Sequence, residues 1–331
     1  KMSNINNLKE KVLSGINISK QEAMTLWNSD YNELCSSADE IRRHFCENRF
    51  DICTIINGKS GKCTENCKFC AQSSFYHTHA DEYPLLDTES IVNEAVSNSE
   101  QGILRFSIVT SGKRLSDSEV NKMCETIREI HKKTNISVCV SFGLLNEEQY
   151  KKLKNAGVSR VHNNLETSEN YFKNVCTSHT FEDKIHAVKA AQNAGLSVCS
   201  GGIMGLGETD EDRTDMAFTL RELGIKSVPI NMLNPIPGTP FENNQKLTEK
   251  DMCRICAVYR FILPDASIRL AGGRGLMESK GKECFKSGAN SAISGNMLTT
   301  SGITIKTDMK LLKELNYSCL LYTSPSPRDR G

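Results

Sequence analysis

Lys62–Gln72 reads Lys-Cys-Thr-Glu-Asn-Cys-Lys-Phe-Cys-Ala-Gln and places Cys63, Cys67 and Cys70 in a C-x3-C-x2-C array. Thiolates select zinc ions or iron–sulfur clusters. A structural zinc site takes four protein ligands, usually as two separated pairs, whereas no fourth Cys or His follows this array within the next few residues. Three thiolates on a cubane 4Fe–4S cluster leave one iron open to another molecule. The spacing therefore favours an open-iron cluster, with zinc or a redox pair as the alternatives.

The residues around the third cysteine make the array more specific. Phe69 precedes Cys70, and the chain continues over residues 70–73 as Cys-Ala-Gln-Ser. The array resembles the signature of the radical S-adenosylmethionine (SAM) superfamily, and its continuation resembles the biotin synthase family. The resemblance implies a 4Fe–4S cluster on Cys63, Cys67 and Cys70, whose open iron chelates the amino and carboxylate groups of SAM. It also implies that Phe69 binds the cofactor and that SAM is cleaved to a 5′-deoxyadenosyl radical.

The composition excludes several classes of protein. The chain has 331 residues, of which 38% are hydrophobic, and its 41 basic and 40 acidic residues give a formal net charge of +1. This length suffices for one large core, and the balanced charge does not favour nucleic acid or an anionic membrane as a partner. No apolar run approaches the roughly 18 residues of a membrane span, and the N-terminus lacks the apolar region of a signal peptide. We expect a cytoplasmic protein.

The chain carries fourteen cysteines, which are spread along its whole length. This distribution differs from the dense disulfide framework of a small secreted module. Metal or redox chemistry is the expected use, together with thiols buried as small hydrophobic side chains. The thiols that have no partner at metal-ligand spacing, or that lie on an apolar helix face, are assigned to the core or the surface: Cys35, Cys46, Cys124, Cys176, Cys253, Cys256, Cys284 and Cys319.

From residue 50 the chain alternates between short β-rich segments and amphipathic helices. The predicted strands are Phe50–Asn57, Leu104–Thr110, Ile136–Phe142, Arg160–Leu165, Ser197–Ile203, Ser227–Leu233, Ser267–Gly272 and Ser291–Ser294. The predicted helices are Thr88–Gln101, Asp117–Lys133, Asn146–Ala156, Phe181–Ala194, Asp210–Leu223 and Thr248–Leu263. Eight alternations predict a closed parallel (β/α)8 barrel of the TIM type, and a doubly wound open sheet is the alternative. The cysteine array then follows the first strand, at the carboxyl end where barrel active sites collect.

The chain divides into four predicted segments. Residues 1–49 form N-terminal helices that pack on the barrel, with a capping box that starts at Ser19 and a further helix predicted over Ser37–Phe45. Residues 50–300 form the barrel, and residues 301–319 form a short C-terminal segment. Residues 320–331 are polar and rich in proline and resemble a translated sequencing adapter. We expect this last segment to be disordered and non-native.

A second metal site follows from the phase of the strands. Cys53, Cys139, Cys199 and Arg269 fall inside the first, third, fifth and seventh predicted strands. The interior of a barrel fills in layers, each contributed by alternate strands, so these four residues could share one inward layer. A buried guanidinium needs anionic partners, which metal-bound thiolates and sulfides would supply. The alternative is that the cysteines are ordinary core residues and that Arg269 pairs with a carboxylate.

The family resemblance bears on the same four residues. In biotin synthases a second iron–sulfur cluster lies deep in the barrel and donates sulfur to the product, and its usual ligands are three cysteines on strands 2, 3 and 5 and an arginine on strand 7. Cys139, Cys199 and Arg269 match, but the strand 2 position is Ser107, whose protonated hydroxyl is a poor iron ligand. Cys53 stands where many members have serine. We expect a remodelled auxiliary cluster, 2Fe–2S or larger, held by Cys53, Cys139 and Cys199, with Arg269 as a ligand or a nearby donor.

The fourth strand ends Val-His-Asn-Asn-Leu-Glu-Thr-Ser over residues 161–168, where polar side chains suit a ligand and a capped turn is the alternative. The resemblance implies that Asn164 contacts substrate and SAM and that Glu166 binds the ribose hydroxyls of SAM. It places Lys184 near the SAM carboxylate, where an amine lacks the bidentate geometry of Arg, and it places Ile203 near the adenine.

The sixth strand and the loop after the eighth carry the expected substrate contacts. Residues 228–240 read Val-Pro-Ile-Asn-Met-Leu-Asn-Pro-Ile-Pro-Gly-Thr-Pro, which closely resembles the biotin synthase family. By this resemblance Asn231 bonds the ureido ring of dethiobiotin, since an amide offers both a donor and an acceptor. Thr299 and Thr300 match the segment that binds the substrate carboxylate through hydroxyl and backbone N–H groups.

The resemblance covers residues 8–316 and implies the conversion of dethiobiotin to biotin. Two deoxyadenosyl radicals would abstract hydrogen in turn from the methyl and methylene carbons of the substrate, which would take its sulfur from the auxiliary cluster. A flavodoxin or ferredoxin is implied as the electron donor, and a homodimer as the assembly. Two alternatives stay open: another radical SAM enzyme of the same branch, such as a hydrogenase maturase or a methylornithine synthase, and a non-catalytic iron–sulfur carrier.

Overall fold

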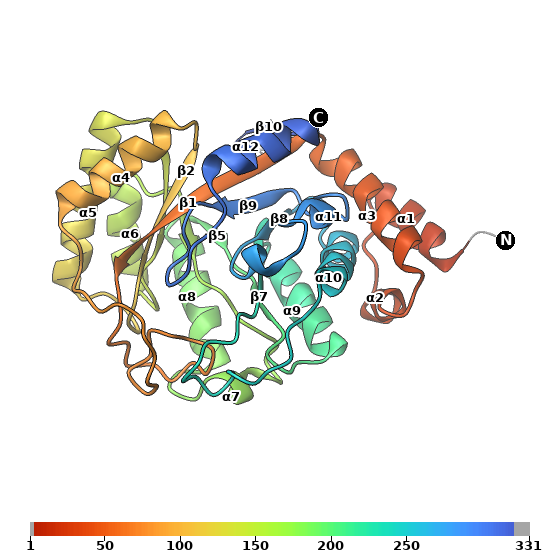
Figure 1. The fold of residues 1–331 in the computed structure, drawn as a ribbon, viewed down its shortest axis with the longest axis horizontal. Coiled ribbons are helices and arrows are strands. Elements are labelled where there is room, and N and C mark those ends of the chain that lie inside the picture. The colour runs from red at the N-terminus through yellow and green to blue at the C-terminus, as the bar shows by residue number, and fades with distance from the viewer. Residues whose placement is uncertain (1–2, 321–331) are drawn as a thin grey trace.

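The computed structural model describes residues 3–320 and begins with three helices that lie outside the barrel (Figure 1). They are α1 (Asn4–Leu13), α2 (Lys20–Leu26) and α3 (Tyr31–Cys46). The predicted capping box at Ser19 is present at the start of α2. Helix α3 begins earlier than the predicted Ser37, because the Asp30 carboxylate accepts a hydrogen bond from the Glu33 N–H at 2.8 Å and starts the helix there. Helix α3 packs against α10 (Glu249–Ile262), which fixes the three helices to one side of the barrel.

The barrel is a closed parallel sheet. Its strands are β1 (Arg49–Lys59), β2 (Arg105–Thr110), β3 (Ser137–Ser141), β4 (Arg160–His162), β5 (Ser197–Cys199), β6 (Gly202–Met204), β7 (Ser227–Met232), β8 (Ser267–Leu270) and β9 (Ser291–Ser294). Each pairs in parallel with its neighbour, and β1 pairs with both β2 and β9. Closure through β1 and β9 confirms the (β/α)8 barrel and excludes the open sheet. A short β10 (Ser318–Cys319) pairs with the start of β1.

The predicted fifth strand is split into β5 and β6 by Ser200 and Gly201. A Cβ atom added at Gly201 would lie 1.9 Å from the Pro229 carbonyl oxygen. The neighbouring strand β7 therefore approaches the chain too closely for any side chain at this position. Beyond the split, β6 continues beside β7, and Gly202 also forms an isolated parallel bridge with Glu166.

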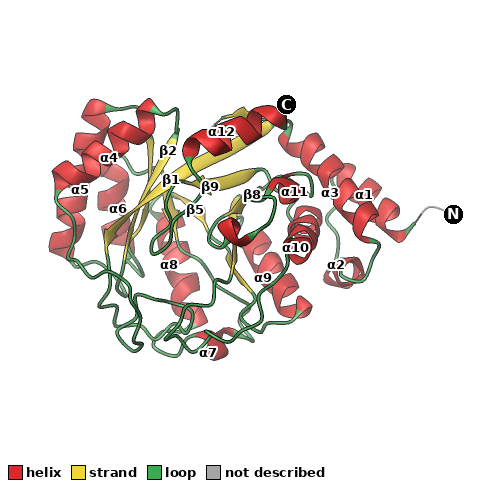
Figure 2. Cartoon of the chain, viewed as in Figure 1, coloured by secondary structure: helices red, strands yellow, loops and turns green. Residues whose placement is uncertain are grey.

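Helices cover the outside of the barrel (Figure 2). They are α4 (Thr88–Glu100), α5 (Asp117–Lys133), α6 (Glu147–Ala156), α7 (Phe172–Val175), α8 (Phe181–Asn193), α9 (Asp210–Glu222), α10, η1 (Arg274–Leu276), α11 (Lys282–Phe285) and α12 (Ile305–Glu314). The six predicted barrel helices agree with α4, α5, α6, α8, α9 and α10 to within one residue at each end. This agreement has a local cause, because capping boxes start five of them, at Ser116, Asn146, Thr180, Thr209 and Thr248.

The two faces of β1 show how the barrel sorts its side chains. Phe50 points outward, where its ring lies 5.0 Å from that of Phe285 and 5.1 Å from that of Tyr317. Asp51 and Cys53 alternate with it and are buried on the inward side. The apolar core therefore lies between sheet and helices, whereas polar and thiol side chains fill the interior.

The long loops collect at the carboxyl ends of the strands, along the lower edge of the view in Figure 1. The loop that carries Cys63, Cys67 and Cys70 leaves β1 at this edge. Among residues 3–320 no helix is long and apolar enough to cross a membrane. The expectations for residues 321–331 lie outside the described part of the chain, and the division at residues 49 and 300 stays a prediction.

Candidate active site

One cavity of about 360 Å³ runs from the loop after β1 into the barrel. It brings together most of the side chains that the sequence predicted: Cys53, Phe69, Cys70, Ser107, Cys139, Asn164, Glu166, Cys199, Ile203, Asn231, Arg269, Thr299 and Thr300. The predicted site residues that do not line it, within the described chain, are Cys63, Cys67 and Lys184. We call the loop segment Gly61–Tyr76 the rim, and the inward layer around Asp51 and Arg269 the floor.

The rim is fixed by its own hydrogen bonds. The Cys63 N–H donates to the Gln72 carbonyl at 3.0 Å, and the Cys70 N–H donates to the Cys67 carbonyl at 3.0 Å. The side-chain oxygen of Gln72 accepts a bond from the Gly61 N–H at 3.1 Å. The three thiols are thus held on one short turn before any metal is considered. Burial raises the pKa of Cys70 to about 11, so a bound metal is what would deprotonate it. The rim fits an open-iron cluster.

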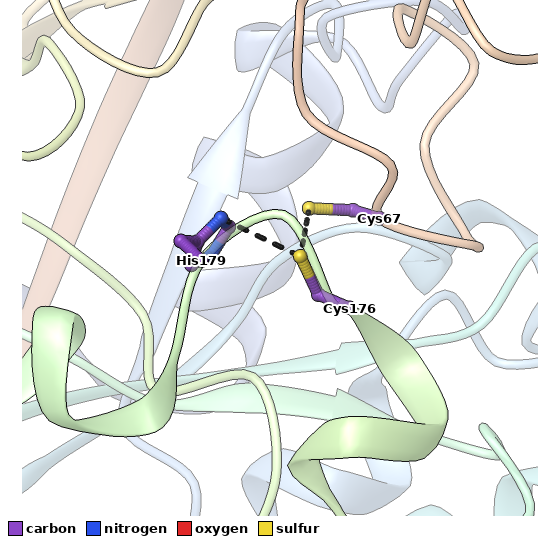
Figure 3. A group of neighbouring side chains, drawn as sticks. All are labelled: Cys67, Cys176 and His179. Carbon is purple, nitrogen blue, oxygen red and sulfur yellow. Dashed lines mark hydrogen bonds between the residues drawn. The ribbon is translucent and has the colours of Figure 1, made fainter.

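Cys67 has an additional neighbour that the sequence did not reveal (Figure 3). Its Sγ lies 3.7 Å from Cys176 Sγ, which in turn lies 3.4 Å from His179 Nδ1. Cys176 follows α7 directly, and His179 lies just before α8. The hydrogen bond from Cys67 lowers the pKa of Cys176 to about 3, opposed by burial and assisted by His179. The Cys67 thiol therefore points at Cys176 and His179.

The floor is built around one carboxylate and three guanidinium groups. Asp51 lies 3.2 Å from Arg269, 3.4 Å from Arg160 and 3.6 Å from Arg105, measured between the nearest oxygen and nitrogen atoms. All four side chains are buried. Among the described residues, Asp51 Oδ1, Arg105 Nε and Arg269 Nη2 have no hydrogen-bond partner. Three buried cations on one anion leave an excess of positive charge, which a group of thiolates and sulfides would neutralise.

The three floor thiols lie beside these guanidinium groups. Arg269 Nη1 donates to Cys53 Sγ at 3.2 Å. Burial raises the pKa of Cys139 to about 11. Burial also raises the pKa of Cys199, but a hydrogen bond with His162 and the nearby arginine charges outweigh it and lower the pKa to about 6. The predicted juxtaposition of Cys53, Cys139, Cys199 and Arg269 in one inward layer is present. Its chemistry fits an anionic iron–sulfur cluster.

Two amide side chains form the polar wall between rim and floor. Asn164 Oδ1 accepts the Gly201 N–H at 3.1 Å. Asn231 donates from Nδ2 to the Gly202 carbonyl at 3.0 Å and accepts the Gly272 N–H at 2.8 Å. An amide has two N–H donors and two lone pairs, so Asn231 keeps one of each for a ligand. The wall can therefore present a paired donor and acceptor to a ring such as a urea.

Comparison with known proteins identifies the family. The family model described as the radical SAM superfamily matches residues 59–220, and that of the biotin and thiamin synthesis associated domain matches residues 229–318. A biotin synthase of Brachyspira hyodysenteriae is 60% identical over 313 residues, which cover 95% of this chain and 94% of that protein. The chain belongs to the biotin synthase family.

Further relatives and solved structures agree with this membership. Biotin synthases of Clostridium botulinum (strain Alaska E43 / Type E3) and Akkermansia muciniphila are 55% and 54% identical, and the matches cover 96% of this chain and 99% and 98% of those proteins. A methylornithine synthase structure has a TM-score of 0.82 at 18% identity, with 95% of this chain and 97% of that chain covered. A maturase of the FeFe-hydrogenase has a TM-score of 0.82 at 19% identity, with 97% and 76% covered. At these identities the structural likeness shows the fold alone.

In this biotin synthase family member, Glu166 combines an unusual backbone conformation with a buried carboxylate. Its φ of 71° lies in the left-handed region, and its Oε2 atom is buried without a hydrogen bond among the described residues. Burial raises the pKa of Glu166, and the nearby Lys184 and His162 oppose this. Lys184 Nζ lies 3.4 Å from Asn163 Oδ1, behind the cavity wall. A buried, unsatisfied carboxylate at this place is suited to accept hydrogen bonds from a ligand's hydroxyl groups.

Several residues of this family member were missed by sequence reasoning. Asp51, Arg105 and Arg160 complete the floor, and their inward phase on β1, β2 and β4 could have revealed them. Cys176 was assigned no partner, although Cys-x2-His spacing to His179 is a metal-ligand spacing. Cys284 was also left without a partner, and its Sγ lies 3.5 Å from that of Cys253. Cys253 and Cys256, predicted to be core or surface thiols, are both fully buried in the core.

Proposed function

We propose that the protein converts dethiobiotin to biotin by radical SAM sulfur insertion. The observation that carries this proposal is the single cavity that joins two thiol sites, one at the rim and one at the floor, in a chain of the biotin synthase family. A carrier of iron–sulfur clusters needs neither two sites that face one cavity nor the polar wall between them. When bound, the 4Fe–4S cluster with SAM would supply radical chemistry at the rim, and the auxiliary cluster would supply sulfide at the floor.

The rim residues hold the first of these groups. Cys63, Cys67 and Cys70 would bind three irons of the 4Fe–4S cluster. The hydrogen bonds within the rim support this role, because they fix the turn independently of the metal. Cys70 and Phe69 line the cavity, so the cluster would face the interior of the barrel with Phe69 beside the bound SAM.

The floor residues hold the second group. Cys53, Cys139 and Cys199 would bind the auxiliary cluster, and Arg269 would be a ligand or donate hydrogen bonds to it. The contact from Arg269 to Cys53, at 3.2 Å, supports the inclusion of Cys53. Ser107 lines the same layer, but its hydroxyl stays protonated near neutral pH and makes it a poor ligand. The excess of buried positive charge stabilises the thiolate form of the ligands.

The polar wall positions the two small molecules. Asn231 would bond the ureido ring of dethiobiotin through its remaining N–H and lone pair, and Thr299 and Thr300 at the mouth would bind the carboxylate. Asn164 would contact both molecules. Glu166 would accept the ribose hydroxyls of SAM, since its Oε2 atom lacks another partner among the described residues.

The remaining contacts concern SAM alone. Ile203 lines the cavity beside Asn231 and would cover the adenine. Lys184 is the proposed partner of the SAM carboxylate, although its amine lies behind Asn163 here. This amine forms no ion pair with a carboxylate among the described residues, so its charge is available to a ligand. The enclosed barrel keeps water and stray hydrogen donors away from reactive carbon.

The assembly and the electron supply rest on the sequence resemblance. A flavodoxin or ferredoxin would reduce the rim cluster, and two copies of the chain would form a homodimer in the cytoplasm. The balanced net charge of +1 is consistent with a protein that binds neither nucleic acid nor membranes.

An anaerobic assay tests the proposed function. The reconstituted protein is mixed with SAM and a reductant, with and without dethiobiotin, and 5′-deoxyadenosine and biotin are measured by mass spectrometry. We expect biotin only with dethiobiotin, and one 5′-deoxyadenosine for each C–H bond broken. Formation of 5′-deoxyadenosine without biotin would favour another radical SAM reaction, and the absence of both products would favour an iron–sulfur carrier.

A further inference from the structure

We propose that Cys67, Cys176 and His179 form a binding site for a thiophilic divalent cation, Zn²⁺, in the cluster-free protein. The three ligand atoms all lie within 4.8 Å of one another. In Figure 3 the thiol of Cys67 and the ring of His179 both point toward Cys176. This set differs from the rim array, because it combines one rim cysteine with two residues of the segment between α7 and α8.

Two of the three distances between the ligand atoms match a tetrahedral zinc ion, and the third lies within 4.8 Å. Zinc binds Cys sulfur at about 2.3 Å and His nitrogen at about 2.0–2.1 Å, so tetrahedral angles require about 3.8 Å between two sulfurs and about 3.6 Å between sulfur and nitrogen. The observed separations are 3.7 Å from Cys67 Sγ to Cys176 Sγ and 3.4 Å from Cys176 Sγ to His179 Nδ1. A disulfide would need the two sulfurs at about 2.0 Å, which the observed arrangement does not approach.

The two segments that carry the ligands are joined by a network of hydrogen bonds. The Asn66 side-chain oxygen accepts the N–H groups of Thr177 and Ser178, both at 3.0 Å. The Lys68 N–H donates to the Val175 carbonyl at 3.0 Å. Because these bonds use backbone atoms and a rim side chain, they hold the thiols and the imidazole together without help from a metal. The site is preorganised.

Glu65 lies beside the three ligands. Its Oε2 atom lies 2.5 Å from His179 Nδ1 and 2.8 Å from the Ser178 hydroxyl, and the side chain is buried. A zinc ion bound at Nδ1 would replace the hydrogen bond between His179 and Glu65, which leaves the fourth position to Glu65 or to water. On binding, zinc displaces any proton that a thiol still carries, and this proton leaves to solvent. Zinc binds Nδ1 of a neutral His179 imidazole whose proton lies on Nε2, and no electron is transferred.

The site has a consequence for the assembly of the rim cluster. Cys67 cannot serve zinc and iron at once, so zinc and the 4Fe–4S cluster exclude each other. Zinc would hold the rim against the segment before α8 until it is removed. This competition rests on the proposed cluster at Cys67, whereas the zinc site itself does not.

Metal titration of the full-length, cluster-free, thiol-reduced protein tests the site under anaerobic conditions. Co²⁺ is added first, because tetrahedral thiolate coordination gives it a diagnostic absorption, and Zn²⁺ is then added in competition with a chelating dye. We expect one zinc per chain. Cys176→Ser and His179→Gln should each weaken zinc binding by at least about tenfold.

Two matched variants separate this site from other thiols. Cys70→Ser removes a rim ligand that does not contact Cys176, and Cys284→Ser removes a buried thiol paired with Cys253 at 3.5 Å. Both should keep the zinc affinity of the wild-type protein. Zinc binding that survives Cys176→Ser and His179→Gln but is lost in Cys70→Ser would overturn the proposal in favour of the rim array. Binding that survives in all four variants, or no binding in the wild-type protein, would overturn it as well.

A second measurement tests the competition independently of biotin formation. Iron and sulfide are supplied to the cluster-free protein with and without one equivalent of Zn²⁺, and cluster absorbance is followed over time. Zinc should slow cluster formation at least about tenfold in the wild-type protein and should leave its rate in Cys176→Ser unchanged. Circular dichroism of each variant shows whether it is folded, and His179→Gln replaces Cys176→Ser if the latter is not. Equal slowing in wild type and variant would refute the competition, even if the protein makes biotin.

Discussion

The rim and the floor both gather three thiols, but they do so in opposite ways. The rim places Cys63, Cys67 and Cys70 on one turn of a loop, held by backbone hydrogen bonds. The floor takes Cys53 and its partner thiols from separate strands and surrounds them with buried guanidinium groups. A loop can lose a thiol and keep its fold, whereas the floor joins metal binding to the electrostatics of the barrel. Thiol ligands on a loop can therefore be lost without a change in the stability of the fold, whereas thiol ligands among buried charges cannot.

The largest effect is expected from the rim. Cys70→Ser should reduce 5′-deoxyadenosine and biotin formation to background, because the 4Fe–4S cluster loses a ligand, while the thermal midpoint of the cluster-free protein stays within a few degrees. Mass spectrometry of the products tests the expected loss of activity, and a thermal melt tests the expected stability. A large drop in the thermal midpoint would break the comparison, since the rim would then also support the fold.

The next effect is expected at the floor, where it shows whether Cys53 is a ligand of the auxiliary cluster. Cys53→Ala and Cys139→Ala should each remove the auxiliary iron and sulfide and abolish biotin formation, whereas 5′-deoxyadenosine formation continues. Iron and sulfide analysis with Mössbauer spectroscopy measures the loss, and Ser107→Ala serves as the matched control that keeps both. If Cys53→Ala leaves the auxiliary content unchanged while Cys139→Ala removes it, Cys53 does not replace the thiolate missing at Ser107.

Removal of the negative charge at the floor should lower the free energy of unfolding. Asp51→Asn leaves three buried guanidinium groups without their carboxylate and should destabilise the cluster-free protein by about 3–5 kcal/mol. Urea unfolding measures the change. Glu129→Gln, which removes the exposed ion pair with Lys132, is the control and should cost less than about 1 kcal/mol. Equal costs would show that the floor charges are well solvated.

The same carboxylate predicts a dependence on pH. Burial raises the pKa of Asp51, but Arg269, Arg105 and Arg160 outweigh it and lower the pKa to about 2 from its ordinary value of 3.8. Because the folded-state pKa is the lower one, this contribution to stability is present above pH 3.8 and is lost as the pH falls toward 2. The difference in unfolding free energy between wild type and Asp51→Asn should shrink over this range. A constant difference would contradict the assignment.

The smallest effects belong to the polar wall. Asn231→Ala should weaken dethiobiotin binding by about ten- to a hundredfold, the equivalent of roughly 1.5–3 kcal/mol of hydrogen bonding, without loss of either cluster. Thr300→Val, at the exposed mouth, should weaken it by only about fivefold. Calorimetric titration of dethiobiotin into the SAM-bound protein measures both. A larger loss for Thr300→Val than for Asn231→Ala would place the main anchor at the mouth.

The rim and the floor also differ in how much of each could be predicted from the sequence. The rim array could be predicted because its ligands are neighbours in the chain, and the helix limits could be predicted because capping boxes are local. The floor layer of Cys53, Cys139, Cys199 and Arg269 was accessible through the two-residue period of strands. The same period could have placed Asp51, Arg105 and Arg160 on the inward side, but not the pairing of their charges, because the partner of a buried charge depends on strand register. The contact of Cys67 with Cys176 depends on how two loops fold over each other, which no local pattern records.

Two backbone N–H groups in the polar wall donate their hydrogen bonds to side chains. The N–H groups of Gly201 and Gly272 are bonded to Asn164 and Asn231 rather than to a strand carbonyl. Their hydrogen exchange with solvent is therefore controlled by the rotation of two side chains and not by the opening of the sheet. The exchange rates of these two amides would therefore show whether a ligand occupies the cavity next to Asn164 and Asn231.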